Sequence, residues 1–335
     1  LIKTYNLMNV ILKFLLAFVV SFSFASLEAQ KKTIGSVERL SAEIEQFVPQ
    51  DAIIEILAEG FDWSEGPVWV EELGAVLFSD VPNNTIYQWD EKKGLQVFRN
   101  PSGFTNIVPN SKEQGSNGLT LDANNKLIIC MHGDRRIARL DDWNKNDFTT
   151  VVGEFEGKLF NSPNDLVYSR NGDLYFTDPP YGFKNGDKDS LKQIPFNGVY
   201  KLSQAGELSL LVKDLERPNG IALSNDESIL YVTNSHAGNP GIMAYDLKAD
   251  GVSNGRLFFD GKALSKKDKG SFDGLKIHPS GTIFTTGPGG VLVINDKGTH
   301  LGTIRTEVRS ANCAFSPDFK TLYMTSDNYL TRIKL

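Results

Sequence analysis

A polar residue and a glycine stand directly before a short apolar run in the segment Pro218-Asn-Gly-Ile-Ala-Leu223. The same order recurs at five other places in the chain. Each copy is followed by a turn rich in Asp, Asn, Gly or Ser and then by further short apolar runs. The six copies begin at Ser64, Ser116, Pro163, Pro218, Phe272 and Ala311. Self-similarity on this scale indicates a repeat architecture.

The spacing of the copies indicates which kind of repeat fold they form. Their marker polar residues are separated by 52, 47, 55, 54 and 39 residues, and a blade of four antiparallel strands takes about 40 to 50 residues. Short runs such as Lys126–Cys130 and Leu230–Asn234 are typical of strands, and Asn171-Gly172 of the turns between them. The sequence therefore predicts an all-β fold over residues 51–335, a six-bladed β-propeller with four-stranded antiparallel blades.

The two ends of this region are complementary. The last copy stops one strand short, at Tyr329–Leu335, and the strand-like run Ala52–Ala58 precedes the first copy without a partner. Pairing these N- and C-terminal strands would complete the sixth blade and remove an exposed edge. We expect this pairing to close the propeller, with residues 30–50 as a lead segment.

Residues 1–29 have the layout of a secretory signal. Lys3 and Lys13 flank the apolar run Phe14–Ala25, and a small residue stands near the expected cut. A membrane anchor is the alternative, but the run is short for a span of about 20 residues. We therefore expect a cleaved signal peptide, no membrane attachment afterwards, and a periplasmic or secreted protein.

Composition narrows the function classes. Of the 335 residues 40% are hydrophobic, enough for a packed core, and the net charge of −6 comes without a basic block outside the N-terminus. This argues against nucleic-acid binding, which needs clustered positive charge. Cys130 and Cys313 both lie in apolar runs, which favours buried free thiols over a disulfide. The oligomeric state stays open.

The marker positions form the candidate site. The first strand of each blade lines a propeller's axis, so these six side chains should converge on one channel: Glu65, Asn117, Asn164, Asn219, Asp273 and Asn312. Each Asn-Gly or Asp-Gly alone is an ordinary turn former, but six in phase indicate a functional ring. Carboxylate and amide oxygens suit a hard cation such as Ca²⁺, and the chain has no Cys/His cluster for structural zinc.

At these motifs the chain resembles the senescence-marker-protein/gluconolactonase family, the regucalcin-like calcium-dependent propeller hydrolases, from about Glu59 to Leu335. The segments that carry the resemblance are Glu65–Trp69, Ser162–Asp165, Phe176–Gly182, Arg217–Gly220 and Phe272–Gly274. The resemblance implies that Glu65, Asn164, Asn219 and Asp273 bind the metal. The ion implied is Ca²⁺, with Zn²⁺, Mn²⁺ and Mg²⁺ left open because oxygen-rich sites accept several divalent ions. Asn117 and Asn312 do not map onto ligands and are expected to line the channel.

The resemblance also implies the chemistry, hydrolysis of a small sugar lactone such as gluconolactone. The metal would polarise the carbonyl, and Asp273 would act as base for water. Direct nucleophilic attack by Asp273 stays open. Asn117, His132 and Tyr181 are candidates for contacting substrate, although His132 beside a tight Gly turn and Tyr181 after Asp-Pro-Pro also suit purely structural roles. Asp165 is expected to support Asn164.

Two further features bear on specificity. The polar insertion 183–197 is longer than a hairpin needs, and such loops on a rigid scaffold often carry specificity. Arg135-Arg136 is expected on a solvated face, where an acidic or phosphorylated sugar could use it. The alternatives are a phosphotriesterase of the diisopropylfluorophosphatase type and a non-catalytic binding scaffold. A scaffold has no need for two acids on its axis, so Glu65 and Asp273 argue against it.

Overall fold

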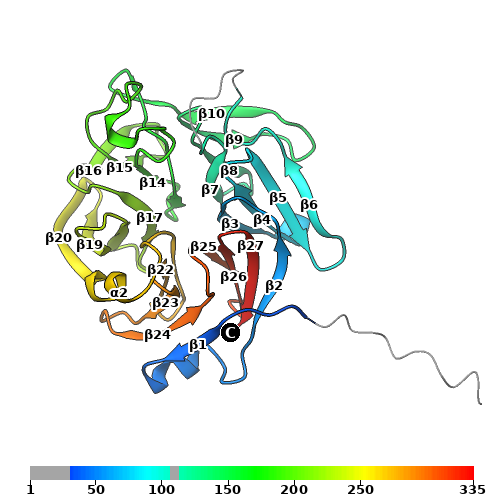
Figure 1. Cartoon of the computed structure of the whole chain (residues 1–335). Helices are drawn as coiled ribbons and strands as arrows, with labels where there is room; N and C mark the ends of the chain where they lie inside the picture. The colour runs from blue at the N-terminus through cyan, green and yellow to red at the C-terminus, as the bar shows by residue number, and fades with distance from the viewer. Residues whose placement is uncertain (1–30, 106–112) are drawn as a thin grey trace, which may run out of the picture. The chain divides into compact units, whose positions relative to one another are not determined.

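Six antiparallel sheets follow one another along the chain and surround a central channel (Figure 1). The computed structural model describes residues 31–105 and 113–335, so the predicted signal peptide lies outside the described residues. Thr33–Leu335 forms one compact unit, and the description below concerns this unit alone. The prediction of an all-β, six-bladed propeller is confirmed.

Within each of the first four blades the strands pair in chain order, and the first strand lies beside the channel. Blade 1 comprises β3 (Ser64–Val70), β4 (Ala75–Asp80), β5 (Thr85–Asp90) and β6 (Gly94–Arg99). Blade 2 comprises β7 (Ser116–Leu121), β8 (Leu127–Met131), β9 (Arg136–Leu140) and β10 (Phe148–Val152). Blade 3 comprises β13 (Leu166–Tyr168), β14 (Leu174–Asp178), β15 (Gly198–Leu202) and β16 (Leu208–Val212). Blade 4 comprises β17 (Pro218–Leu223), β18 (Ile229–Asn234), β19 (Gly241–Lys248) and β20 (Gly251–Asp260).

The last two blades also take strands from the start of the described chain. Blade 5 comprises β21 (Leu275–Ile277), β22 (Ile283–Gly287), β23 (Gly290–Ile294), β24 (His300–Arg305) and, as a fifth strand, β1 (Ser36–Arg39). Blade 6 comprises β25 (Ser310–Phe315), β26 (Thr321–Ser326), β27 (Tyr329–Lys334) and β2 (Ile54–Glu59). Short elements fill the connections: β11 (Glu154–Phe155), β12 (Lys158–Leu159), the 3₁₀ turns Ala42–Gln46, Glu71–Leu73 and Gly186–Lys188, and α2 (Lys262–Lys267).

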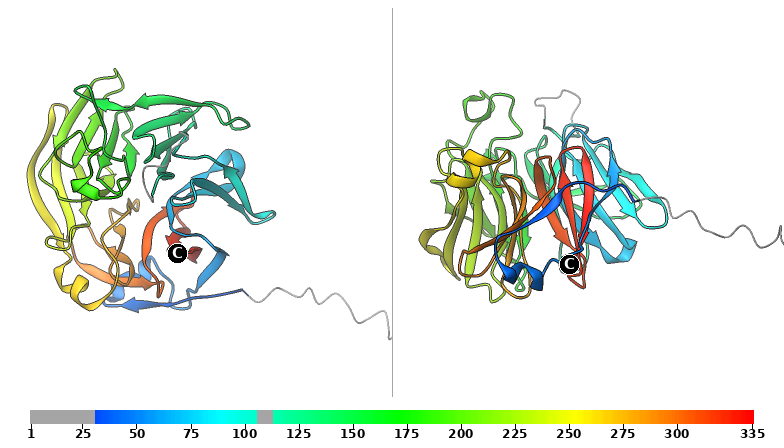
Figure 2. Two further views of the ribbon diagram at one scale, coloured as in Figure 1. Left: turned by 45° about the horizontal axis from the view of Figure 1, so that its top comes forward. Right: turned by 60° about the horizontal axis from the view of Figure 1, so that its bottom comes forward.

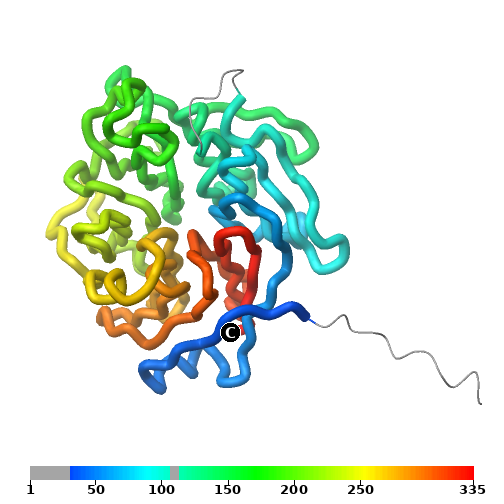
Figure 3. The backbone as a smooth tube through the Cα atoms, in the orientation of Figure 1, coloured from blue at the N-terminus to red at the C-terminus, as the bar shows by residue number. Residues whose placement is uncertain are grey.

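The propeller is closed by its N- and C-terminal strands, as predicted. In the antiparallel pair of β2 and β27, Ile54 stands opposite Ile333 and Ile56 opposite Thr331. The blue and red ends of the described chain therefore meet in blade 6 (Figure 3). The lead segment continues beyond this closure, because β1 pairs along β24 with Val37 opposite Ile304 (Figure 2).

The core is divided among the contacts between blades. Each of six buried apolar clusters joins two neighbouring blades; Leu77 with Ile129, and Phe284 with Met324, are examples. Cys130 and Cys313 lie in two of these clusters as free, buried thiols, as predicted. None of the helices in the described residues has the length and apolarity that a membrane crossing requires.

The glycines of the repeated motif have a packing role. A Cβ on Gly66 would lie 2.2 Å from the backbone oxygen of Asn117, and one on Gly220 would lie 2.3 Å from that of Asp273. Such distances are possible only without a side chain. The Asn-Gly and Asp-Gly pairs therefore allow neighbouring inner strands to approach closely beside the channel.

Candidate active site

The inner strands all run from one mouth of the channel to the other. Residues at the start of these strands line a cavity of about 330 Å³ at the first mouth. Its wall includes five of the six marker residues together with Tyr181: Glu65, Asn117, Asn164, Asn219, Asp273 and Tyr181. The structure thus brings together the four residues predicted as metal ligands and two of the three predicted to contact substrate.

Hydrogen bonds between blades hold the marker residues in place. The hydroxyl groups of Ser79, Thr177 and Thr233, each on the second strand of a blade, donate to the backbone oxygens of the next blade's marker residue. The acceptors are Asn117 at 2.8 Å, Asn219 at 2.6 Å and Asp273 at 2.7 Å, respectively. These bonds fix the start of one inner strand against the neighbouring blade.

Three acids lie on the cavity wall, Glu65, Glu113 and Asp273, and two of them, Glu65 and Asp273, lie in a poorly solvated environment. Burial raises the pKa of Glu65 to about 8, although the Gly66 N–H donates to its carboxylate at 3.1 Å. Burial also raises the pKa of Asp273 well above its ordinary value, and the nearby carboxylates of Glu65 and Asp165 add to this effect. Two acids that burial pushes toward the neutral form are a suitable place for a bound cation, which would favour their ionised forms.

Several oxygen atoms of the cavity wall have no partner. Among the described residues, the buried Oδ1 atoms of Asn117, Asn219 and Asp273 accept no hydrogen bond. Burying such acceptors unsatisfied costs free energy, so their presence calls for a ligand. Carboxylate and amide oxygens are the donors that Ca²⁺ and Mg²⁺ prefer, and the residues therefore fit a hard divalent cation.

The sixth marker residue, Asn312, does not line this cavity. Its Nδ2 donates to Asp165 at 3.3 Å, and the ammonium of Lys276 lies 3.3 Å from its Oδ1 and 3.8 Å from the Asp165 carboxylate. A cluster of polar side chains therefore lies between the two ends of the channel, formed by Asp165, Lys276 and Asn312. Asp165 also follows Asn164 directly, in keeping with a supporting role.

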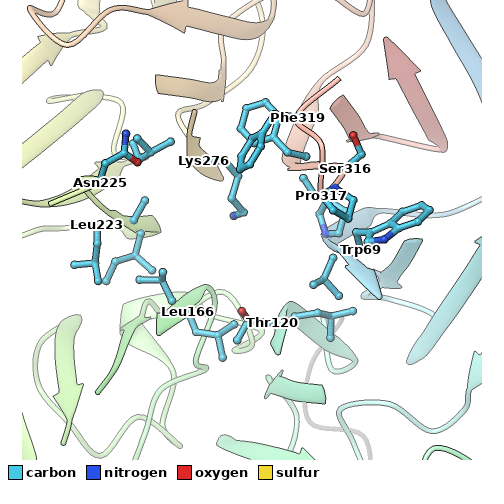
Figure 4. A pocket seen from close by; sticks show the side chains of 18 residues that line it. Trp69, Thr120, Leu166, Leu223, Asn225, Lys276, Ser316, Pro317 and Phe319 are labelled. Carbon is cyan, nitrogen blue, oxygen red and sulfur yellow. The ribbon is translucent and has the colours of Figure 1, made fainter. Parts of the chain in front are cut away.

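The opposite mouth has a different character. A second cavity of about 430 Å³ is lined mainly by apolar residues from all six blades, among them Trp69, Leu166, Leu223 and Phe319 (Figure 4). Lys276 is its single charged lining residue among the described residues, and its side chain extends toward the open centre (Figure 4). The oxygen-rich chemistry is therefore confined to the first mouth.

His132 lies behind the wall rather than on it. Its side chain is 1% exposed and it is not among the residues that line the cavity. Burial lowers its pKa to about 4, and the backbone of Glu113 offsets part of this effect. Both ring nitrogens are buried without a hydrogen-bond partner among the described residues, and contact of His132 with substrate stays a prediction.

The Arg135-Arg136 pair is not the solvated face that its charge predicts. Arg135 is 7% exposed, donates to the backbone oxygen of Phe160 at 2.6 Å and stacks on Phe183 at 4.9 Å. Buried backbone oxygens and an aromatic face compete successfully with water for this guanidinium. Arg136 pairs with Asp134 at 3.0 Å. Neither arginine is among the residues that line the cavity.

The family follows from a comparison with known proteins. A family model described as the SMP-30/gluconolactonase/LRE-like region matches residues 63–328. The chain belongs to this family. The resemblance drawn from its motifs is thus confirmed.

Members of the family match nearly the whole chain. Gluconolactonase of Zymomonas mobilis is 36% identical over 309 residues, which cover 90% of this chain and 86% of that protein. Lactonase drp35 of Staphylococcus saprophyticus is 26% identical, with 90% of each chain covered. The structure of a gluconolactonase from Xanthomonas campestris matches with a TM-score of 0.79 at 27% identity, covering 92% of this chain and 99% of that one.

In this SMP-30/gluconolactonase fold, the residues two positions before the markers also line the cavity. Trp63, Arg217 and Ser271 precede Glu65, Asn219 and Asp273 by two residues and lie in the connections that lead into the inner strands. Their common offset from these three markers could have found them. Ser235 and Arg309 reach the wall from connections between strands, for which the repeat gives no signal.

The insertion 183–197 reaches the cavity wall indirectly. It connects β14 to β15, and its residue Asp187 accepts a hydrogen bond from the Arg217 guanidinium. On the other side of the mouth, Arg309 stacks over Trp63 at 4.7 Å. The mouth of this family member therefore presents two cations that the sequence analysis missed.

Proposed function

We propose that this chain hydrolyses a sugar lactone with the help of a divalent cation at the first mouth of the channel. The observation that carries the proposal is the buried, unpaired oxygen set of Asn117, Asn219 and Asp273 beside the Glu65 carboxylate. The names of the Zymomonas, Staphylococcus and Xanthomonas relatives support the choice of a lactone.

Glu65, Asn164, Asn219 and Asp273 would hold the cation, for which Ca²⁺ is the first choice given the mixture of carboxylate and amide oxygens. When bound, such an ion supplies Lewis-acid polarisation of the lactone carbonyl. The two acids balance its double charge. Asn117 is left to orient a substrate hydroxyl group through its unpaired Oδ1.

Asp273 is the proposed base. Its carboxylate would take a proton from water as the water oxygen bonds to the carbonyl carbon; the ring C–O bond then breaks, and the departing alkoxide takes up a proton. The Thr233 hydroxyl holds the backbone of Asp273 at 2.7 Å and so fixes the position of this carboxylate. Tyr181, also on the wall, can donate its phenolic proton to a sugar oxygen, since burial raises its pKa.

Proton release during hydrolysis of glucono-1,5-lactone tests the proposal. The purified mature chain is measured after EDTA treatment and again with Ca²⁺, Mg²⁺, Mn²⁺ or Zn²⁺ restored. We expect activity to disappear with EDTA and to return with one of these ions. Asp273→Asn should lower kcat at least about 100-fold, as expected when a general base is lost, whereas Asp226→Asn, in an exposed turn, should leave it unchanged.

The same assay separates base from nucleophile. In a single turnover in H₂¹⁸O, a general base leaves ¹⁸O only in the product acid, whereas attack by Asp273 leads to ¹⁸O in the protein's own carboxylate after the intermediate is hydrolysed. A folded protein that binds metal but hydrolyses no lactone with any ion would contradict the proposal. It would direct attention to phosphotriester substrates or to a binding role.

A further inference from the structure

A second hollow adjoins the cavity at the first mouth. It has a volume of about 340 Å³ and shares three lining residues with the cavity, Ser235, Ala237 and Ser271. Two of these shared residues carry hydroxyl groups. The cavity at the marker residues and the hollow therefore lie side by side at these three residues.

The hollow is cationic and polar. Its far side is formed by Lys262, Ser265 and Lys266 of α2, and none of its described lining residues is acidic. Among the described residues, no carboxylate lies within 4.0 Å of either ammonium group. The neighbouring Lys267 differs, because its ammonium is 3.6 Å from the Glu38 carboxylate and it does not line the hollow.

Two free ammonium groups and three hydroxyl groups around a hollow without acids form an environment for an anion. The adjoining cavity differs from the hollow, because its wall carries charges of both signs: three carboxylates, of Glu65, Glu113 and Asp273, and two guanidinium groups, of Arg217 and Arg309. Both arginines also have acidic partners, Asp187 and Asp327. Among the described residues, the hollow beside α2 is lined by cations without acids.

We propose that the lactone substrate carries an anionic substituent, a carboxylate or a phosphate, which lies in the hollow against Lys262 and Lys266. This inference rests on the proposed lactonase function and names its substrate class. The lactone ring lies at the marker residues, and the anion lies beyond Ser235 and Ser271. An acidic sugar lactone is then preferred over a neutral one of the same ring.

The test compares three lactones with the metal-loaded protein. Glucono-1,5-lactone is neutral, glucaro-1,5-lactone adds a carboxylate and 6-phosphoglucono-1,5-lactone adds a phosphate to the same ring. We expect a higher kcat/KM for at least one anionic lactone, and its identity distinguishes the two anions. The double variant Lys262→Gln/Lys266→Gln should lower kcat/KM for that lactone about fivefold, since a single exposed ion pair contributes up to about fivefold.

The controls separate local from general effects. The double variant should leave kcat/KM for glucono-1,5-lactone within about twofold, and Lys267→Gln, on the same helix, should change neither substrate. Added salt should reduce the preference for the anionic lactone because screening weakens exposed charge pairs. Hydrolysis of glucono-1,5-lactone without any preference for anionic lactones, or equal losses for both classes in the double variant, would overturn the anion subsite alone. No hydrolysis of any lactone would overturn the proposed function and this substrate with it.

Discussion

At the scale of single residues, the marker motif combines two requirements in adjacent positions. In four of the six copies the polar side chain faces the channel, and the glycine that follows leaves room for the backbone of the next blade. Gly220 shows both, because it follows Asn219 and lies against the backbone oxygen of Asp273. Packing and chemistry are therefore coupled at the channel wall.

Gly220→Ala tests this coupling. The added Cβ would stand 2.3 Å from the Asp273 oxygen, so the inner strands of blades 4 and 5 must separate. We expect the free energy of unfolding to fall by about 2–3 kcal/mol, the range of severe packing defects, together with a loss of lactone turnover. Gly153→Ala is the matched control: its nearest neighbour would be 3.6 Å away, and stability in urea should change by less than about 1 kcal/mol.

Asp178 gives a prediction about pH. Its buried carboxylate accepts the N–H groups of Asn161 and Ser162 at 2.8 and 2.7 Å, and burial raises its pKa to about 7, with Lys192 and Arg135 opposing the rise. The folded state thus holds a proton that the unfolded state has released above its pKa of about 4. This contribution to stability is complete at low pH and is lost as pH rises to about 7, by on the order of 1 kcal/mol per pH unit.

Asp178→Asn removes this titration without removing the side chain. The difference in free energy of unfolding between wild type and variant, measured in urea from pH 5 to pH 7.5, should shift against the wild type as pH rises. A difference that is constant over this range, or that moves in the wild type's favour, would contradict the assignment.

At the scale of elements, the sequence predicts the strands more completely than it predicts the contacts of the segments that connect the strands. The six in-phase markers and the unpaired run before Ser64 were sufficient for the blades and for the closure by β2, because strand period and edge protection are local properties. Val37 against Ile304 in the fifth strand of blade 5 was not predicted, since a single short strand carries little periodic signal. Arg309 was missed because it lies in a connection between strands, for which the repeat gives no signal.

Among the side chains of the channel, the repeat predicts some positions correctly and others wrongly. Period and phase placed Glu65 and Asp273 on one wall, but they placed Asn312 there as well. Asn312 turns instead to Asp165 and Lys276, because a buried carboxylate and an ammonium offer its amide both an acceptor and a donor. His132 has no counterpart in the repeat; it lies close to Gly182, on which an added Cβ would stand 3.4 Å from the His132 Cβ.

Deleting residues 51–58 tests the closure. Blade 6 would lose the strand that covers β27, and its edge would be exposed along the Ile333 and Thr331 positions. We expect no cooperative unfolding transition by circular dichroism and a larger apparent size in gel filtration. Removal of residues 1–32, which leaves all the strands of the described residues in place, is the control and should keep the transition. A truncated chain that still unfolds cooperatively would refute the role of β2.

At the scale of the whole propeller, the proposed ligands join four blades. Glu65, Asn164, Asn219 and Asp273 come from blades 1, 3, 4 and 5, so a bound cation links elements that are otherwise held by pairwise blade contacts. A ligand that binds only the folded state stabilises it by about 2.7 kcal/mol at 100 times its Kd. Metal binding should therefore be visible as stability, independently of turnover.

Thermal unfolding with EDTA and with excess Ca²⁺ measures this link. We expect Ca²⁺ to raise the Tm by about 5 °C or more in the wild type. Asn219→Ala should abolish most of the shift because it removes an unpaired oxygen of the wall. Asn312→Ala is the matched control: its amide faces Asp165, so the Ca²⁺ shift should persist even if the starting Tm is lower. Equal shifts in both variants would exclude Asn219 as a ligand.

The pairing of β2 with β27 has one more consequence. Because Ile54 lies opposite Ile333, the beginning and the end of the propeller are neighbours in one sheet, and the order of the blades around the channel does not depend on where the chain is interrupted. Joining these two points through a short linker and opening the chain in the exposed turn at residues 204–207, between β15 and β16, would give a circular permutant that keeps the strand pairs of all six blades and loses only the pairing of β1 with β24. The contacts between the blades therefore do not require the chain ends to lie in blade 6.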